Sequence, residues 1–296
     1  MSCCAGPNVC VVLLLTLGSL APVARAFDKQ GSAHGGAVGE APSGFGVSGN
    51  VTLGTSVLNS SYAARPDNTG LAGMRYATHV DVDLVGPLLS LPIDVNVFSD
   101  KTRAGLRAFA PSELDVILGL TSTQTLSRAL SAELGARVER DSPVDEGRYT
   151  QTYGDARVKL LYSLGAASPR LASSLHGGNL SGSVTLGWFA YNPTYAARPD
   201  NTGIALLRYG THHELSVWRN HLALGADAIL FTDKRSSNVI APTELDFTYE
   251  IIARYRTWSA HLAYERDMPL DQGGLVQSFV YTSLSYDFDL RPHAAN

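Results

Sequence analysis

Ionisable side chains recur at alternate positions along several segments of this chain, and acids outnumber bases among them. Twelve of these residues form the candidate set: Arg75, His79, Asp81, Asp94, Glu113, Asp115, Arg208, His212, Glu214, Asp227, Glu244 and Asp246. A two-residue period places side chains on one face of an extended strand. Carboxylates and guanidinium groups that share one face of a closed, low-dielectric wall bind and select small ions. We therefore predict that these residues line an interior that recognises charge.

The same residues do not predict a metal centre or a cofactor site. His212 and His213 are adjacent, and adjacent strand residues point to opposite faces, so they do not form a joint ligand pair. We expect His212, like His79, on the polar face and His213 on the apolar face. Calcium binding by the acidic segments 140–145 and 266–271 is a weaker alternative, because they lack the ordered oxygen spacing of an EF-hand.

A long internal repeat organises the chain. The nonapeptide YAARPDNTG occurs at residues 62–70 and again at 195–203, and the surrounding segments 48–79 and 181–212 share 21 of 32 positions. Later matches follow at offsets that fall from 133 to 131 and 126. A unit of this length is too long for a solenoid repeat. We predict two duplicated halves, residues 45–164 and 180–290, that close into one body.

The repeated loop carries polar residues of its own: Arg65, Asp67, Asn68, Arg198, Asp200 and Asn201. Pro66 and Gly70 suit a tight turn at this place. Two interpretations stay open. The loop either folds into the interior as a constriction or ligand contact, or it is a duplicated turn retained for folding.

Strict alternation of apolar and polar residues dominates each half, and helical periodicity is nearly absent. In the first strand Val51 and Leu53 lie on one face, and Asn50 and Thr52 on the other. The pattern predicts six strands of about ten residues in each half, twelve in all, joined alternately by long polar loops and short turns. The long loops are 59–73, 99–112 and 140–150.

The ends of the chain differ from this pattern. Residues 1–26 combine an apolar run with a small-x-small motif at Ala24 and Ala26, which predicts a cleaved secretory signal peptide. All three cysteines lie in this leader, so the exported chain has no disulfides. Residues 27–44 are predicted to be a flexible tail, and residues 291–296 a C-terminal tail. Without the leader the chain has 22 basic and 27 acidic residues, a net charge of −5, which argues against nucleic-acid binding.

These features together resemble those of bacterial outer-membrane β-barrel proteins, porin-like in the broad sense. An even number of ten-residue strands, with long loops on one side and short turns on the other, is typical of them. Trp218, Tyr255 and Trp258 fall at the short-turn ends of strands, and Trp188 at a long-loop end, as in interfacial aromatic girdles. The resemblance covers residues 45–290. It implies an all-β fold, a single transmembrane antiparallel barrel embedded in outer-membrane lipid.

The resemblance also implies a function. We expect a narrow channel for small polar solutes or ions, not an enzyme. The polar faces of the predicted strands carry fifteen acids and six bases, an excess of nine negative charges, which favours cations. The alternative is a non-conducting barrel that has structural, adhesive or partner-binding loops. An outer-membrane hydrolase is a lesser alternative, because no spacing of Ser and His residues indicates a nucleophile.

Overall fold

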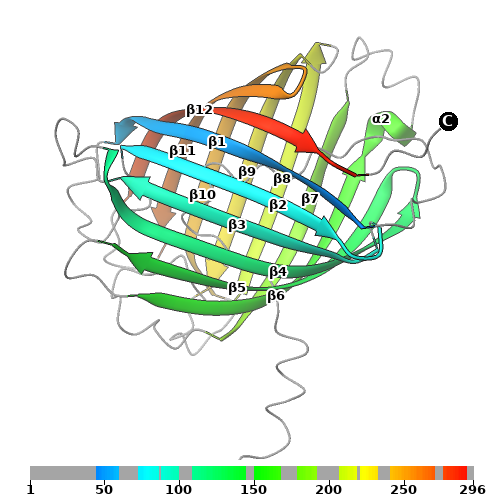
Figure 1. The fold of residues 1–296 in the computed structure, drawn as a ribbon, viewed down its shortest axis with the longest axis horizontal. Coiled ribbons are helices and arrows are strands. Elements are labelled where there is room, and N and C mark those ends of the chain that lie inside the picture. Colours follow the sequence, from blue (N-terminus) through cyan, green and yellow to red (C-terminus); the bar gives the residue numbers. More distant parts are fainter. Residues whose placement is uncertain are drawn as a thin grey trace, which may run out of the picture.

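The computed structural model is a closed barrel of twelve antiparallel strands (Figure 1). It describes residues 45–59, 73–86, 88–99, 109–144, 150–167, 179–191, 207–218, 221–232, 241–270 and 276–291. The strands are β1 (Gly46–Asn59), β2 (Met74–Asp83), β3 (Ser90–Ser99), β4 (Pro111–Ser127), β5 (Leu130–Pro143), β6 (Gln151–Ser163), β7 (Leu180–Tyr191), β8 (Leu207–Trp218), β9 (Leu222–Thr232), β10 (Pro242–Tyr255), β11 (Trp258–Pro269) and β12 (Gln277–Asp289). The predicted fold class and strand number are confirmed.

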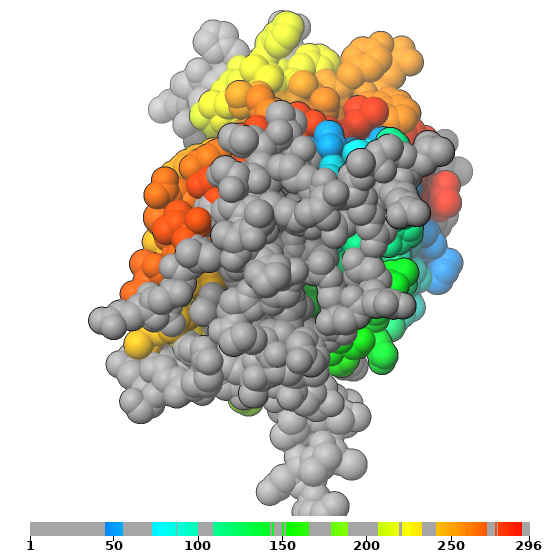
Figure 2. All heavy atoms as spheres, turned by 90° about the vertical axis from the view of Figure 1, so that its left-hand side faces the viewer, coloured from blue at the N-terminus to red at the C-terminus, as the bar shows by residue number. Residues whose placement is uncertain are grey.

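The barrel closes through β1, which pairs with β2 on one side and with β12 on the other. Val51 lies opposite Thr78 in β2 and opposite Tyr286 in β12. Seen from the left-hand end of Figure 1, the first strands in blue and cyan lie beside the last strand in red (Figure 2). Closure removes the open sheet edges, so the backbone polar groups of the strands bond to neighbouring strands, as a lipid environment requires.

The two faces of the wall have opposite character. Large apolar side chains are exposed on the outer face of every quarter of the barrel, among them Leu53, Leu134, Val158, Leu186, Ile251 and Leu284. Their neighbours in sequence point inward and include buried polar groups such as Thr52, Lys159 and Ser283. An apolar exterior around a polar interior is the arrangement of a transmembrane barrel.

Exposed aromatic side chains lie near both ends of the barrel. Tyr255 and Trp258 are exposed at the ends of β10 and β11, which are joined by two residues. Trp218 is exposed at the end of β8, and Trp188 near the opposite end of β7. Each lies where the sequence predicts an interfacial aromatic. In the short turn between β2 and β3, Gly86 has a φ of 53°, a left-handed conformation that suits glycine.

Helix is almost absent from the described part of the chain. The helix α2 (Leu164–Ala167) has four residues and follows β6. No helix among the described residues has the length and apolar character needed to cross a bilayer.

Several strands around the barrel are longer than predicted, and the longest is β4. β4 has 17 residues and β5 has 14, compared with the predicted length of about ten. The predicted loop 140–150 therefore begins as strand, because β5 continues to Pro143. The reason is that alternation persists there: Glu139 and Asp141 are buried and Arg140 between them is exposed.

The predicted domain boundaries concern segments that the structure describes only in part. The signal peptide at residues 1–26 and the tail at 27–44 lie outside the described residues, and of the predicted tail 291–296 only Arg291 is described. β6 ends at Ser163 and β7 begins at Leu180, on either side of the predicted junction of the halves. The duplication of two six-strand halves stays a prediction from the sequence repeat.

The strand order gives a prediction about the repeated loops. Six strands separate the loop after β1 from the loop after β7, so both leave the barrel from the same end. Single cysteines in place of Asn68 and Asn201 are expected to react equally with a membrane-impermeant maleimide on intact cells. Labelling of one position without the other would contradict the strand order.

Candidate functional site

The inward face near the long-loop end of the barrel carries two similar rows of residues. In the first row, Arg75 on β2 lies opposite Phe98 on β3, which lies opposite Glu113 on β4. In the second, Arg208 on β8, Phe231 on β9 and Glu244 on β10 have the same relation. The guanidinium carbons lie 5.6 Å and 6.0 Å from the centres of the Phe98 and Phe231 rings, within cation–π range.

Four aromatic rings near the long-loop end, two of them in these rows, are buried inside the barrel. Phe98, Phe231 and Tyr153 have no exposed surface, and Phe279 is 1% exposed. The sequence pattern did not reveal this, because apolar residues were expected on the outer face. Their positions in the two-residue alternation, in step with Glu113, Glu139 and Glu265 on the neighbouring strands, place them inside.

Next to each row lies a cluster of three buried carboxylates. The first consists of Glu113, Asp115 and Asp141, and the second of Glu244, Asp246 and Asp267. Within each cluster one oxygen per residue lies within 4.8 Å of the other two. Asp141 and Asp267 were not among the candidate residues, because segments 140–145 and 266–271 were interpreted as loops. The continued alternation after Glu139 and Glu265 was the signal that places both aspartates in strands.

Tyr153 contacts the first cluster directly, and Arg75 contacts Asn96 beside it. The Tyr153 hydroxyl donates to Asp141 Oδ2 at 2.5 Å and lies 3.3 Å from Glu139 Oε1. Arg75 Nη2 donates to Asn96 Oδ1 at 2.6 Å, and Asn96 is the register partner of Asp115. The first cluster therefore belongs to a buried polar network inside the barrel.

Two histidines, His79 and His212, lie in a second layer that is further from the long-loop end. His79 Nδ1 lies 2.7 Å from Asp94 Oδ1, and His79 Nε2 lies 2.9 Å from Asp81 Oδ2. In the second half His212 Nδ1 lies 2.8 Å from Asp227 Oδ1. His213, beside it, instead contacts the Tyr162 hydroxyl on the outer face. His212 and His213 thus point to opposite faces of the wall, as the sequence predicts.

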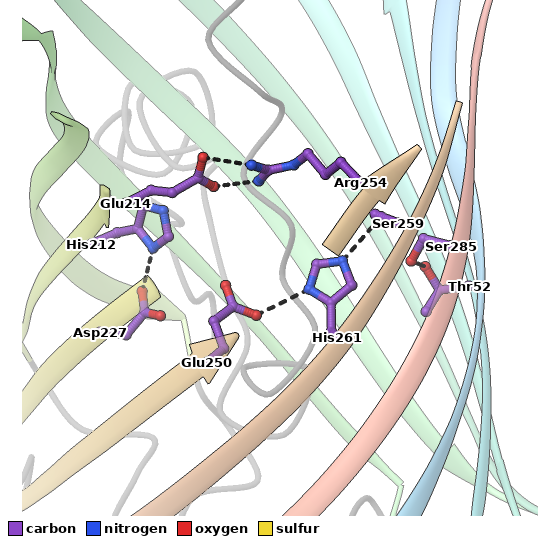
Figure 3. A network of polar contacts seen from close by, with 9 residues as sticks. All are labelled: Thr52, His212, Glu214, Asp227, Glu250, Arg254, Ser259, His261 and Ser285. Atoms are coloured by element: carbon purple, nitrogen blue, oxygen red, sulfur yellow. Dashed lines mark hydrogen bonds and ion pairs between the residues drawn. The ribbon is translucent and has the colours of Figure 1, made fainter. Parts of the chain in front are cut away.

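The third layer holds a bidentate ion pair and a short polar relay (Figure 3). Arg254 Nη1 donates to Glu214 Oε1 at 2.9 Å, and Nη2 donates to Oε2 at 2.5 Å. This pair joins β10 to β8 across the inner side of β9. His261 Nδ1 lies 3.1 Å from Glu250 Oε2, and its Nε2 lies 3.1 Å from Ser259 Oγ.

The structure places the twelve candidate residues in these layers, and Glu214 has a partner, Arg254, that was not in the candidate set. That the twelve residues line a pore stays a prediction. Glu250 and His261 were also left out, although the alternation places both on the polar face. The loop residues Arg65, Asp67, Asn68, Arg198, Asp200 and Asn201 lie outside the described residues.

The fold resembles solved bacterial barrels. A KdgM porin in complex with disordered oligogalacturonate is 6% identical, with 82% of this chain and 99% of that chain aligned and a TM-score of 0.46. A NanC porin is 13% identical, with 80% of this chain and 98% of that chain aligned and a TM-score of 0.44. The outer membrane protein Omp33 of Acinetobacter baumannii is 8% identical, with 82% of this chain and 97% of that chain aligned and a TM-score of 0.39. No protein-family model and no curated protein matches the chain. The closed twelve-strand barrel with its apolar exterior confirms the predicted resemblance to outer-membrane barrels, and no specific family is identified.

Proposed function

We propose that the chain is a narrow outer-membrane channel for small polar solutes or ions that prefers cations. The observation that carries this proposal is the charge balance of the interior. Among the described residues, nine buried carboxylates accompany three buried basic groups, Arg75, Arg137 and Lys159. Fixed negative charge inside a low-dielectric wall concentrates cations and repels anions. The apolar exterior of the barrel supports the membrane location.

The layers of the interior support a narrow passage. Buried aromatic rings lie near the long-loop end, and the Arg254–Glu214 pair spans three strands nearer the other end. Such features favour small solutes over large ones. The side chains of His79, Asp81 and Asp94 remain 24%, 34% and 21% exposed, so water contacts the middle layer.

A non-conducting barrel is the second candidate, and one observation favours it. Ion pairs already join basic and acidic groups of the interior, between neighbouring strands for Arg157 and Glu133 at 3.1 Å, and across β9 for Arg254 and Glu214 at 2.5 Å. In that case the ion pairs hold the interior closed, and the function lies in the loops.

The Glu250–His261–Ser259 relay has the order of an acid, a base and a hydroxyl nucleophile. Ser259 is only 1% exposed, however, and lies between Arg254 and Ser285 in the sheet register. A buried hydroxyl gives no access to an acyl substrate, so we assign the relay a structural role. A fluorophosphonate probe is expected to leave Ser259 unlabelled in the folded barrel.

Liposome swelling tests the proposed function. Liposomes that contain the folded full chain are expected to swell quickly in a small neutral monosaccharide and slowly in a trisaccharide. Protein-free liposomes provide the baseline. Absence of swelling in every solute would contradict the channel and favour the non-conducting barrel.

A further inference from the structure

We propose that Glu113, Asp115 and Asp141 bind one hard divalent cation of the Ca²⁺ type, and that Glu244, Asp246 and Asp267 bind a second. The proposal goes beyond the proposed function and does not depend on it, since the two sites need no conduction. The sites use six of the nine buried carboxylates, and nine negative charges with three basic groups and two divalent ions leave a buried charge of −2, which still favours cations. It rests on strand register, burial and the hydrogen bonding of one carboxylate.

Strand register builds each cluster. Asp115 on β4 lies directly opposite Asp141 on β5, and Glu113 is two residues from Asp115 on the same face of β4. Cross-strand partners and residues two apart are the nearest neighbours on one face of a sheet. One oxygen from each residue lies within 4.8 Å of the other two. Two ligands of one Ca²⁺ lie up to about 5 Å apart, because each is 2.3–2.6 Å from the ion.

Burial makes a cluster of three acids without a cation unfavourable. Glu113, Asp115 and Asp141 are 5%, 1% and 5% exposed. Buried like charges repel strongly, and each carboxylate also loses hydration. A divalent cation removes both penalties, because it supplies positive charge and ligand bonds at the same point. Glu139 is beside the cluster but has its own partners, Arg137 at 3.8 Å and Tyr153.

The carboxylate of Asp115 gives the second, independent observation. Asp115 Oδ1 is buried and accepts no hydrogen bond from any described residue. Two donors near it bond to other acceptors: Arg75 Nη2 donates to Asn96 Oδ1, and the Tyr153 hydroxyl donates to Asp141 Oδ2. Buried carboxylate oxygens are almost always hydrogen-bonded or bound to a metal. An oxygen ligand set of this kind suits Ca²⁺, with water completing the coordination.

The second half of the chain has the same three acid types in the same register. Asp246 on β10 lies opposite Asp267 on β11, and Glu244 is two residues from Asp246. Glu244, Asp246 and Asp267 are 5%, 2% and 8% exposed. Both clusters lie close to the long-loop end, near the starts of β4 and β10. Each ion therefore links two adjacent strands, β4 with β5 and β10 with β11, at that end of the barrel.

Calorimetric titration of the folded, chelator-treated full chain with CaCl₂ tests the two sites. About two Ca²⁺ per chain are expected for the wild type, one for Asp115→Asn, and none for Asp115→Asn with Asp246→Asn. Asp81→Asn is the matched control, because Asp81 is an interior aspartate outside both clusters, and it should bind two. Each removed ligand is expected to weaken its site by at least about tenfold, since ligand charge sets the affinity.

Heat-modifiable migration in gel electrophoresis establishes that each variant is folded, and Glu113→Gln with Glu244→Gln replaces the aspartate variants if they do not fold. Terbium gives a second readout, because Tyr153 lies close enough to transfer excitation to an ion at the first cluster. Tyrosine-sensitised terbium emission should fall in Asp115→Asn and decline when Ca²⁺ is added. Folded wild type that takes up no Ca²⁺, or variants that bind as the wild type does, would overturn the proposal. Conduction measured in parallel separates this result from the proposed channel.

Discussion

Arginine in place of Tyr249 is expected to prevent stable assembly of the barrel. Tyr249 lies near the middle of β10, and its side chain is 56% exposed on the outer face. An arginine at the bilayer midplane on the lipid face of a barrel costs about 2–4 kcal/mol. That cost is a large part of the usual stability of a folded protein. Leu186→Arg on β7, at a position that is 48% exposed, should have the same effect.

Thr248 provides the matched control for Tyr249. It is adjacent in sequence but buried on the inner face, where its register partners are Glu265 and Asp227. An arginine there gains acidic neighbours, so Thr248→Arg should assemble. The measurement is the folded fraction by heat-modifiable migration of the membrane-extracted protein. Equal behaviour of the Tyr249 and Thr248 variants would contradict the assignment of the two faces.

Loss of the Arg254 guanidinium is expected to increase both conductance and cation preference. The bidentate pair with Glu214 places a positive group and its long side chain across the interior of the barrel. Arg254→Met removes the charge and leaves Glu214 without this partner, which makes the interior more negative. The unpaired, partly buried carboxylate should also destabilise the folded barrel by about 1–3 kcal/mol.

Glu214→Gln removes the negative charge of the pair, so it should lower cation preference, the opposite of the effect of Arg254→Met. The double variant, Arg254→Met with Glu214→Gln, is expected to recover part of the lost stability, because neither charge then lacks its partner. Urea unfolding and single-channel recording measure the two effects separately. A barrel in which Arg254→Met changes neither quantity would show that this pair does not shape the interior.

Much of the fold follows from a single physical regularity, the two-residue period of strands. The period places Leu53 outside and Thr52 inside without reference to any other part of the chain. It also places Asp141 inside, although this residue was interpreted as part of a loop. Proline and several charged residues after Glu139 resemble a loop in composition, but backbone pairing with β4 and β6 extends the strand to Pro143.

The partners within the site depend on register, which the pattern alone does not give. His79 faces Asp94 because β2 and β3 are joined by a short turn that fixes their alignment. Arg254 and Glu214, by contrast, are 40 positions apart and meet across an intervening strand. Phe98 and Phe231 lie inside because their register partners Glu113 and Glu244 do. Composition assigns such rings to the lipid face, and only their position in the alternation corrects this.

Planar-bilayer recording in a KCl gradient tests the central claim, a cation-preferring channel, most directly. The folded wild-type chain is expected to insert with discrete conductance steps and a reversal potential displaced toward that of K⁺. The physical reason is the excess of buried carboxylates over basic groups in the interior. A reversal potential toward that of Cl⁻, or a folded barrel that inserts without conducting, would contradict the account.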